Sequence, residues 1–234
     1  MKLQLLATVA AVLAATPALA VDRTFNDLPA FTSIHIASGI DAVVTVGPAQ
    51  SVVGSAPEAG DLDELKIEVR DGTLKIWRDW DIFDLFGDMG GRDTHFTITA
   101  PSLNSADASS GADVDVSGLS GDKVWLEASS GADLKATDIQ AASIDVDASS
   151  GADLSANGTC ATLDVSVSSG AHAALDNLAC TDGEIEASSG SGARVHLSGS
   201  LKAEASSGAG ITVKGKPANT SVQESSGGSV TIEN

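Results

Sequence analysis

Residues 127–153 read EASSGADLKATDIQAASIDVDASSGAD and contain two copies of Ser-Ser-Gly-Ala-Asp, 20 residues apart. Ser-Ser-Gly recurs along the second half of the chain, where its glycine stands at positions 111, 131, 151, 170, 190, 208 and 227. The successive spacings are 20, 20, 19, 20, 18 and 19 residues. A unit of this length cannot bury an apolar face by itself, so the period predicts copies of one short unit stacked on each other.

Apolar and polar residues alternate within each unit. Leu134 and Ala136 in one run, and Ile144 and Val146 in the next, are separated by single polar residues. A period of two in short runs indicates strands joined by bends rather than an amphipathic helix. The preceding unit has aliphatic residues at equivalent positions, so we expect an all-β chain that forms a parallel β-solenoid with turns of about 19–20 residues.

Each Ser-Ser-Gly is expected at a corner of this solenoid. Glycine has no Cβ, so it can adopt positive φ there or pass close to a neighbouring turn. We expect the adjacent serines to stack in hydrogen-bonded ladders with a structural role.

The two cysteines test this register independently. Cys160 and Cys180 each precede a corner glycine by 10 residues, so they occupy the same place in consecutive turns. Stacked turns bring Cα atoms within the range of roughly 4.4 to 6.8 Å that a disulfide accepts. We therefore expect a structural disulfide between turns, which suits an exported protein.

The beginning of the chain is typical of a secretory signal peptide. Lys2 precedes an apolar stretch that ends at Ala15, and Ala18-Leu19-Ala20 fits an A-x-A cleavage site. We expect residues 1–20 to be removed and the protein to be periplasmic or extracellular, including the cell surface. The apolar stretch is too short to span a bilayer, and no later segment is apolar enough, so no membrane insertion of the mature chain is expected.

Residues 21–234 are expected to form a single β-solenoid domain. Within it, 21–100 hold N-terminal strands, which form a β-rich cap region, and an aromatic flap, and 101–234 hold the repeats. Residues 31–47 alternate as two strands that meet at Ser38-Gly39, and 65–69 and 73–77 read as a hairpin around Asp71-Gly72 because Asp-Gly favours tight turns.

The order of four motifs resembles that of a known family. The motifs are Ser-Gly-Ile-Asp at 38–41, Asp-Gly-Thr-Leu-Lys-Ile at 71–76, Ala-Pro-Ser-Leu at 100–103 and the repeated Ser-Gly-Ala-Asp. Together they resemble the autotransporter adhesin "head GIN" domain of bacterial cell-envelope proteins, over nearly all of the mature chain. The resemblance implies a right-handed parallel β-helix at the cell surface or in the periplasm, with no established catalytic residues.

The charge of the chain limits its partners. There are 13 Lys and Arg against 32 Asp and Glu, which gives a formal net charge of −19. Such a surface repels phosphate groups, so no nucleic acid is expected as a partner. Solubility explains the charge most simply, and binding of a cation or of a basic partner is the alternative.

A possible metal site consists of Asp113, Asp133 and Asp153, each two residues after a corner glycine. Carboxylates stacked about 4.8 Å apart repel each other by roughly 1 kcal/mol per pair even in water, and Ca²⁺ bound by their oxygens would relieve this repulsion. The alternative is a solvated, charged edge, because Lys135 lies beside Asp133. No other cofactor is expected.

A second acidic file consists of Asp107, Glu127, Asp147, Glu186 and Glu204. It is interpreted as a charged surface that discourages association, or else as a site for a basic partner.

The least repetitive segment is aromatic. Its members Trp77, Trp80, Phe83 and Phe86 are expected to form a cap or a side flap, or else to stack on a sugar or dock a partner.

Catalytic signatures are not found in the sequence. The histidines at 35, 95, 172 and 196 are far apart, and no Gly-x-Ser-x-Gly elbow, phosphate loop or Cys-x-x-Cys occurs. We therefore expect a non-catalytic, adhesin-like binding or structural module of the cell envelope, with a glycan or another envelope component as its partner.

Two alternatives stay open. One is a carbohydrate-active β-helix enzyme, a polysaccharide lyase or hydrolase, which would show a groove where two carboxylates and a basic residue converge. The other is a self-assembling structural protein, an oligomer in which the last turn, residues 229–233, pairs with another copy.

Overall fold

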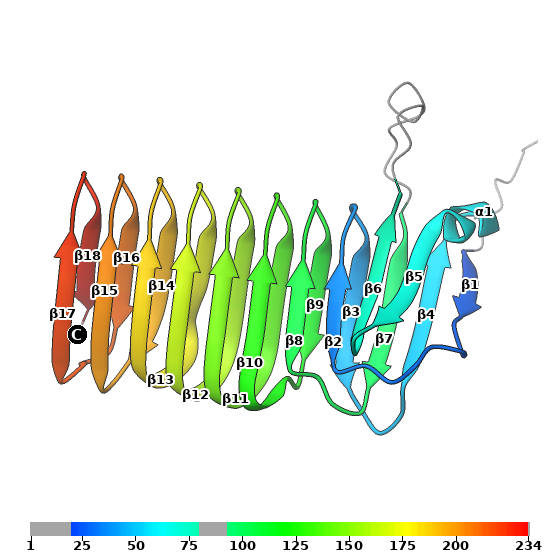
Figure 1. The fold of residues 1–234 in the computed structure, drawn as a ribbon, viewed down its shortest axis with the longest axis horizontal. Helices are drawn as coiled ribbons and strands as arrows, with labels where there is room; N and C mark the ends of the chain where they lie inside the picture. The colour runs from blue at the N-terminus through cyan, green and yellow to red at the C-terminus, as the bar shows by residue number, and fades with distance from the viewer. Residues whose placement is uncertain (1–19, 80–92, 234) are drawn as a thin grey trace, which may run out of the picture.

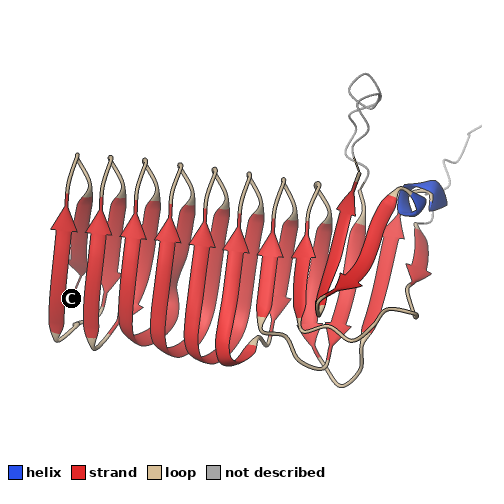
Figure 2. Cartoon of the chain, in the orientation of Figure 1, coloured by secondary structure: helices blue, strands red, loops and turns tan. Residues whose placement is uncertain are grey.

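The computed structural model describes residues 20–79 and 93–233. The expected signal peptide, except for residue 20, and the aromatic residues Trp80, Phe83 and Phe86 lie outside the described residues. Strands make up 65% of the structure and helix 2%, which confirms an all-β chain. Figure 2 shows the strands stacked along one long axis, with the single described helix at the N-terminal end.

The strands form a β-solenoid with two faces (Figure 1). Face I contains β5 (Leu65–Arg70), β6 (Thr73–Arg78), β2 (Ser33–Ile36), β8 (Ser105–Ala108), β10 (Ser120–Ala128), β15 (Ser200–Ala205) and β17 (Asn219–Glu224). Face II contains β1 (Val21–Thr24), β4 (Ser51–Ala56), β7 (His95–Ala100), β3 (Asp41–Val46), β9 (Asp113–Ser117), β14 (Gly192–Leu197), β16 (Gly210–Lys214) and β18 (Ser229–Glu233). The long strands β11 (Asp133–Ala148), β12 (Asp153–Val167) and β13 (His172–Ala187) begin on face II and end on face I.

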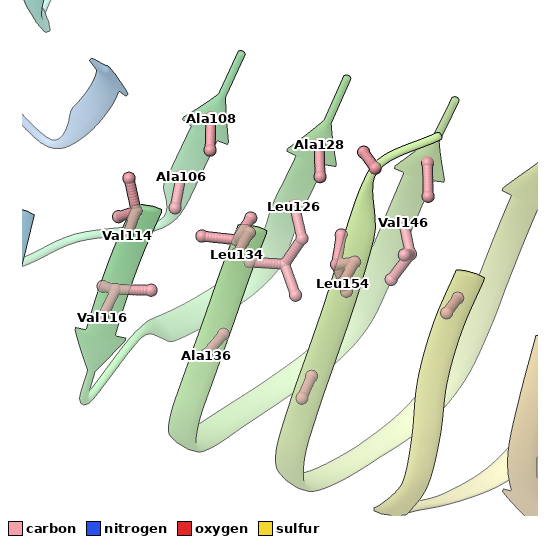
Figure 3. Packing of buried hydrophobic residues seen from close by; sticks show 14 of the residues in the cluster. Ala106, Ala108, Val114, Val116, Leu126, Ala128, Leu134, Ala136, Val146 and Leu154 are labelled. Atoms are coloured by element: carbon pink, nitrogen blue, oxygen red, sulfur yellow. The ribbon is translucent and has the colours of Figure 1, made fainter. Parts of the chain in front are cut away.

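Parallel pairing keeps each position of the repeat in one file. Leu126 lies beside Val146, and Val146 lies beside Val165, and all three side chains are buried. Figure 3 shows such side chains from the two faces pointing toward each other, as do Leu126 and Leu134. The interior is therefore a narrow stack of aliphatic side chains, as the alternation predicts.

The Ser-Ser-Gly corners are tight turns of the main chain. Ser150 has φ 54° and Gly151 has φ 73°, and the Ala152 N–H donates to the Ser149 carbonyl at 3.2 Å. Positive φ at both central residues is the type I′ arrangement. Both the second serine and the glycine of the corner therefore have positive φ. The hydrogen bonds between successive corners run from glycine N–H groups to serine carbonyls, and the Gly131 N–H donates to the Ser150 carbonyl at 3.1 Å.

The opposite edge of the solenoid carries the disulfide. Cys160 and Cys180 are register partners with Cα atoms 4.6 Å apart, and their sulfurs are bonded. The predicted disulfide is confirmed, and with it the register on which it rests. At the same edge Gly158 has φ 141°, and a Cβ there would lie 2.2 Å from the Ile139 carbonyl oxygen.

The N-terminal end departs from simple stacking. β2 lies between β6 and β8, and β3 lies between β7 and β9, so the order of strands in space differs from their order in the chain. β5 and β6 form the predicted hairpin around Asp71-Gly72. The helix α1 (Ala59–Asp63) lies against β4, and its Leu62 is buried. Within residues 20–79 and 93–233, no helix is long and apolar enough to cross a membrane.

Candidate functional site

The predicted metal-site residues lie together on the outer surface of face II. Asp113, Asp133 and Asp153 are register partners in successive turns, and Asp41 extends the file beyond Asp113. Burial raises the pKa of Asp133 above its ordinary value, and the charges of Asp153 and Asp113 raise it further. Among the described residues no group of three or more His, Cys, Asp or Glu side chains is arranged to hold a metal ion. The stacking is as expected, and the calcium site stays a prediction.

The predicted aromatic patch is described at one residue. Trp77 lies on β6, and its Nε1 donates a hydrogen bond to Asp79 Oδ1 at 2.9 Å. The other three aromatic residues lie outside the described residues.

Trp77 belongs to a surface built by five neighbouring strands of face I, in the order β5, β6, β2, β8 and β10. Side chains alternate across a strand, so every second residue points outward. One outward file contains Glu68, Lys75, His35, Asp107 and Glu127, one residue from each strand. The adjacent outward file contains Arg70, Thr73, Ser33, Ser105 and Trp125.

Two adjoining hollows cover this surface. One of about 270 Å³ lies beside Trp125, and the other of about 450 Å³ lies beside Trp77. Both are lined by His35 and Lys75, so we treat them as one depression and name it the tryptophan groove. Its further lining residues are Ser33, Thr73, Ser105, Asp107 and Glu127 on the Trp125 side, and Ala37, Ser38, Glu68, Arg70, Ser109 and Ser110 on the Trp77 side.

Trp125 is an exposed aromatic side chain at one end of the groove. It is 41% exposed, and Lys123 Nζ lies 5.7 Å from its ring centroid. In the next two turns the same file carries Asp145 and Asp164. An indole at this position leaves a flat apolar surface in contact with water, beside hydroxyl and charged groups.

Most charged groups in the groove are paired with each other. His35 Nδ1 contacts Asp107 Oδ2, and Arg70 pairs with Glu68 at 3.0 Å. Burial raises the pKa of Glu127, as do the charges of Asp107 and Asp147, while His35 and a hydrogen bond with Trp125 lower it. The groove thus combines hydroxyl, carboxylate and cationic groups within reach of two indole rings.

A third hollow on face I has a different character. It has a volume of about 580 Å³ and lies over the C-terminal strands of the face. Its lining includes Asp145, Asp164, Asp182 and Glu184 against one cation, Lys202. Burial and then the charges of Asp145 and Glu184 raise the pKa of Asp164. With no aromatic residue in its lining, this hollow offers a ligand charge but no stacking surface.

The sequence interpretation missed most of the tryptophan groove. The sequence shows His35 only as one of four histidines that are far apart, but the structure places it half-buried against Asp107, which lies 72 positions further along the chain. The sequence does distinguish Trp125, because it is the last aromatic residue of the chain and occupies a position that is acidic in the next two turns.

The family model described as "Putative auto-transporter adhesin, head GIN domain" matches residues 30–217. The chain belongs to this family. The match includes every described residue of the tryptophan groove, and it confirms the resemblance inferred from the motifs. Among curated proteins, none matches the chain.

Solved structures show the same fold. A "putative adhesin" from Bacteroides fragilis aligns with a TM-score of 0.82 at 16% identity, over 92% of this chain and 97% of that one. A "putative lipid binding protein" from Parabacteroides distasonis aligns with a TM-score of 0.69 at 16% identity, over 92% and 97% of the two chains. A "putative adhesin" from Parabacteroides merdae aligns with a TM-score of 0.68 at 14% identity, over 92% and 96%. At these identities the likeness establishes the fold alone.

Proposed function

We propose that this adhesin-family protein is an exported, non-catalytic binding module that holds a glycan in the tryptophan groove. The observation that carries the proposal is the exposed indole of Trp125 beside hydroxyl, carboxylate and cationic side chains. Aromatic rings stack on the apolar faces of sugars, and a few polar groups around a pocket fix the orientation of a ligand. The names of the family and of its structural neighbours also favour a binding protein.

The proposed location is the periplasm or the cell exterior. Membership of an adhesin family and the Cys160–Cys180 disulfide both support export, since disulfides persist in oxidising compartments. The glycan would then belong to the cell's own envelope or to a neighbouring surface.

A glycan array followed by calorimetric titration of the best ligand tests the proposal. Trp125→Ala should weaken binding about tenfold, because an aromatic anchor contributes on the order of 1–2 kcal/mol. Ser221→Ala is the matched control, since Ser221 occupies the same outward file at the far end of face I and should leave binding unchanged. If the mature protein retains no glycan, or if Trp125→Ala binds as tightly as the wild type, the proposal is wrong.

A glycan-cleaving enzyme is the second candidate, because Asp107 and Glu127 converge in the groove with His35 and Lys75. Glycoside hydrolysis uses two carboxylates, and a raised pKa such as that of Glu127 suits the acid. However, the two carboxylates of such enzymes flank the scissile bond, whereas Asp107 and Glu127 are register partners that lie side by side on adjacent strands of one sheet. Incubation with the bound glycan should therefore yield no new reducing ends or unsaturated products, and their appearance would favour the enzyme.

A further inference from the structure

We infer that the Trp77 half of the groove selects a carboxylated sugar, such as a uronic acid, linked to a neutral sugar that lies over Trp125. This inference rests on the proposed glycan-binding function and adds the chemical class of the ligand and its direction in the groove. It is carried by the charges of the groove and by a cation in it that has no ion-pair partner among the described residues.

The cation is Lys75 at the centre of the groove. It lines both hollows and is half-buried, but it forms no ion pair with any residue that the structure describes. Most other lysines that the structure describes are paired, as Lys66 is with Asp79 and Lys202 with Glu184, and Lys216 is the exception. In a chain of net charge −19, a half-buried lysine without a counterion lies in a place where a ligand carboxylate would be stabilised.

Neighbouring charges leave Lys75 available. Glu68 lies opposite Lys75 in the antiparallel register, but its carboxylate pairs with Arg70 at 3.0 Å. On the other side, His35 contacts Asp107. The two acidic groups nearest in register to Lys75 therefore have other partners, and an incoming carboxylate meets Lys75.

The two halves of the groove differ in charge. The Trp77 half is lined by Arg70, Lys75 and His35 against a single carboxylate, Glu68. The Trp125 half adds Asp107 and Glu127, whose oxygens accept hydrogen bonds from sugar hydroxyl or amide groups but repel a second carboxylate. A ligand with alternating acidic and neutral rings fits this arrangement better than a uniformly acidic polymer.

The probe for the test is a hexasaccharide of hyaluronan, in which glucuronic acid alternates with N-acetylglucosamine. Its methyl ester is the matched ligand, because it has the same rings without the carboxylate charge. We expect the acid to bind the wild-type protein about fivefold more tightly than the ester at low salt, in keeping with one partly exposed ion pair. Hexagalacturonate should bind more weakly than the hyaluronan hexasaccharide.

Two variants separate the inference from the proposed function. Lys75→Met should remove the preference, so that the acid and the ester bind with equal affinity, while Lys75→Arg should keep the preference. Lys216→Met is the matched control, since Lys216 is exposed, makes no ion pair among the described residues and carries the same charge. Trp125→Ala should weaken the acid and the ester equally.

The outcomes distinguish the two claims. Equal affinity for acid and ester, an unchanged preference in Lys75→Met, or a folded protein that binds only neutral glycans would overturn the inference and leave glycan binding intact. Absence of binding to every glycan would remove the proposed function and this inference together.

Discussion

His35 on β2 and Asp107 on β8 contact each other through Nδ1 and Oδ2, although 72 residues separate them in the chain. The contact exists because β8 pairs in parallel with β2 after the chain has passed through six other elements that the structure describes. Both side chains are about one third exposed or less, so the pair is partly protected from solvent screening. It holds the imidazole at the centre of the tryptophan groove.

Asp107→Asn should weaken glycan binding several-fold while changing the free energy of unfolding by less than about 1 kcal/mol, because partly exposed ion pairs stabilise proteins only weakly. Calorimetric titration and thermal melting measure the two effects. Glu204→Gln, in the same outward file but outside the groove, is the control and should bind normally. A loss of affinity that is equal in both variants would show that overall surface charge, rather than the position of His35, governs binding.

Removing the disulfide should lower stability without changing the fold. The bond closes a loop with a sequence separation of 20 residues, for which the loss of chain entropy predicts about 3 kcal/mol. The double variant Cys160→Ser with Cys180→Ser should therefore unfold at a lower denaturant concentration, and reductant should have the same effect on the wild type. Identical unfolding midpoints with and without reductant would contradict the disulfide.

Substitution of Gly158 at the disulfide edge and of the corner glycine Gly151 should lower the free energy of unfolding by very different amounts. Alanine at Gly158 would place its Cβ 2.2 Å from the Ile139 carbonyl oxygen, so neighbouring turns must separate. Alanine at Gly151, with φ 73° and no atom within 4 Å of its Cβ, faces only the unfavourable left-handed conformation, about 1–2 kcal/mol. Chemical denaturation should show that Gly158→Ala is the more damaging change, and equal costs would argue against the register at that edge.

The pH dependence of stability follows from the raised pKa values. Burial and neighbouring carboxylates raise the pKa of Asp113, Glu127, Asp133, Asp147 and Asp164. A carboxyl group whose pKa is higher in the folded state binds its proton more tightly there, so stability increases as the pH falls through that raised pKa. The gain is complete below the ordinary values of 3.8 for Asp and 4.5 for Glu.

The melting temperature should therefore rise as the pH falls through these raised pKa values toward the ordinary values of 3.8 and 4.5. Asp176 has the opposite effect, because its hydrogen bond with Lys214 lowers its pKa below the ordinary value of 3.8. The stability that Asp176 contributes is therefore lost only when the pH falls below 3.8. At pH 7 and low salt, Asp133→Asn should raise stability by up to about 1 kcal/mol, while Asp122→Asn, outside the file, should have no such effect. A melting temperature that falls as the pH approaches the ordinary values of 3.8 and 4.5 would refute the repulsion.

The periodic part of the fold is predictable because a parallel solenoid keeps each position of the repeat in one file. The repeat therefore predicts correctly that Cys180 lies beside Cys160 and that Asp133 lies beside Asp113. The repeat does not predict the conformation of the corner serines. The sequence indicates positive φ for glycine but not for Ser150, whose positive φ is imposed by the type I′ turn.

The tryptophan groove is harder to predict because it lies where the period fails. Its residues come from strands whose order in space, β5, β6, β2, β8 and β10, differs from their order in the chain. Local patterns identify β2 and the hairpin of β5 and β6 around Asp71-Gly72, but the insertion of β2 between β6 and β8 depends on tertiary packing. Only Trp125, an aromatic residue at a position that is acidic in the next two turns, marks the place in the sequence.

The location of glycan binding is tested most directly by nuclear magnetic resonance of the ¹⁵N-labelled mature protein, titrated with the tightest ligand from the array. We predict that the indole signal of Trp125 and the amide signals of β2, β6 and β8 shift together and saturate with one dissociation constant. Shifts confined to the acidic hollow around Asp164, or no shift with any glycan, would contradict the assignment of the tryptophan groove as the binding site.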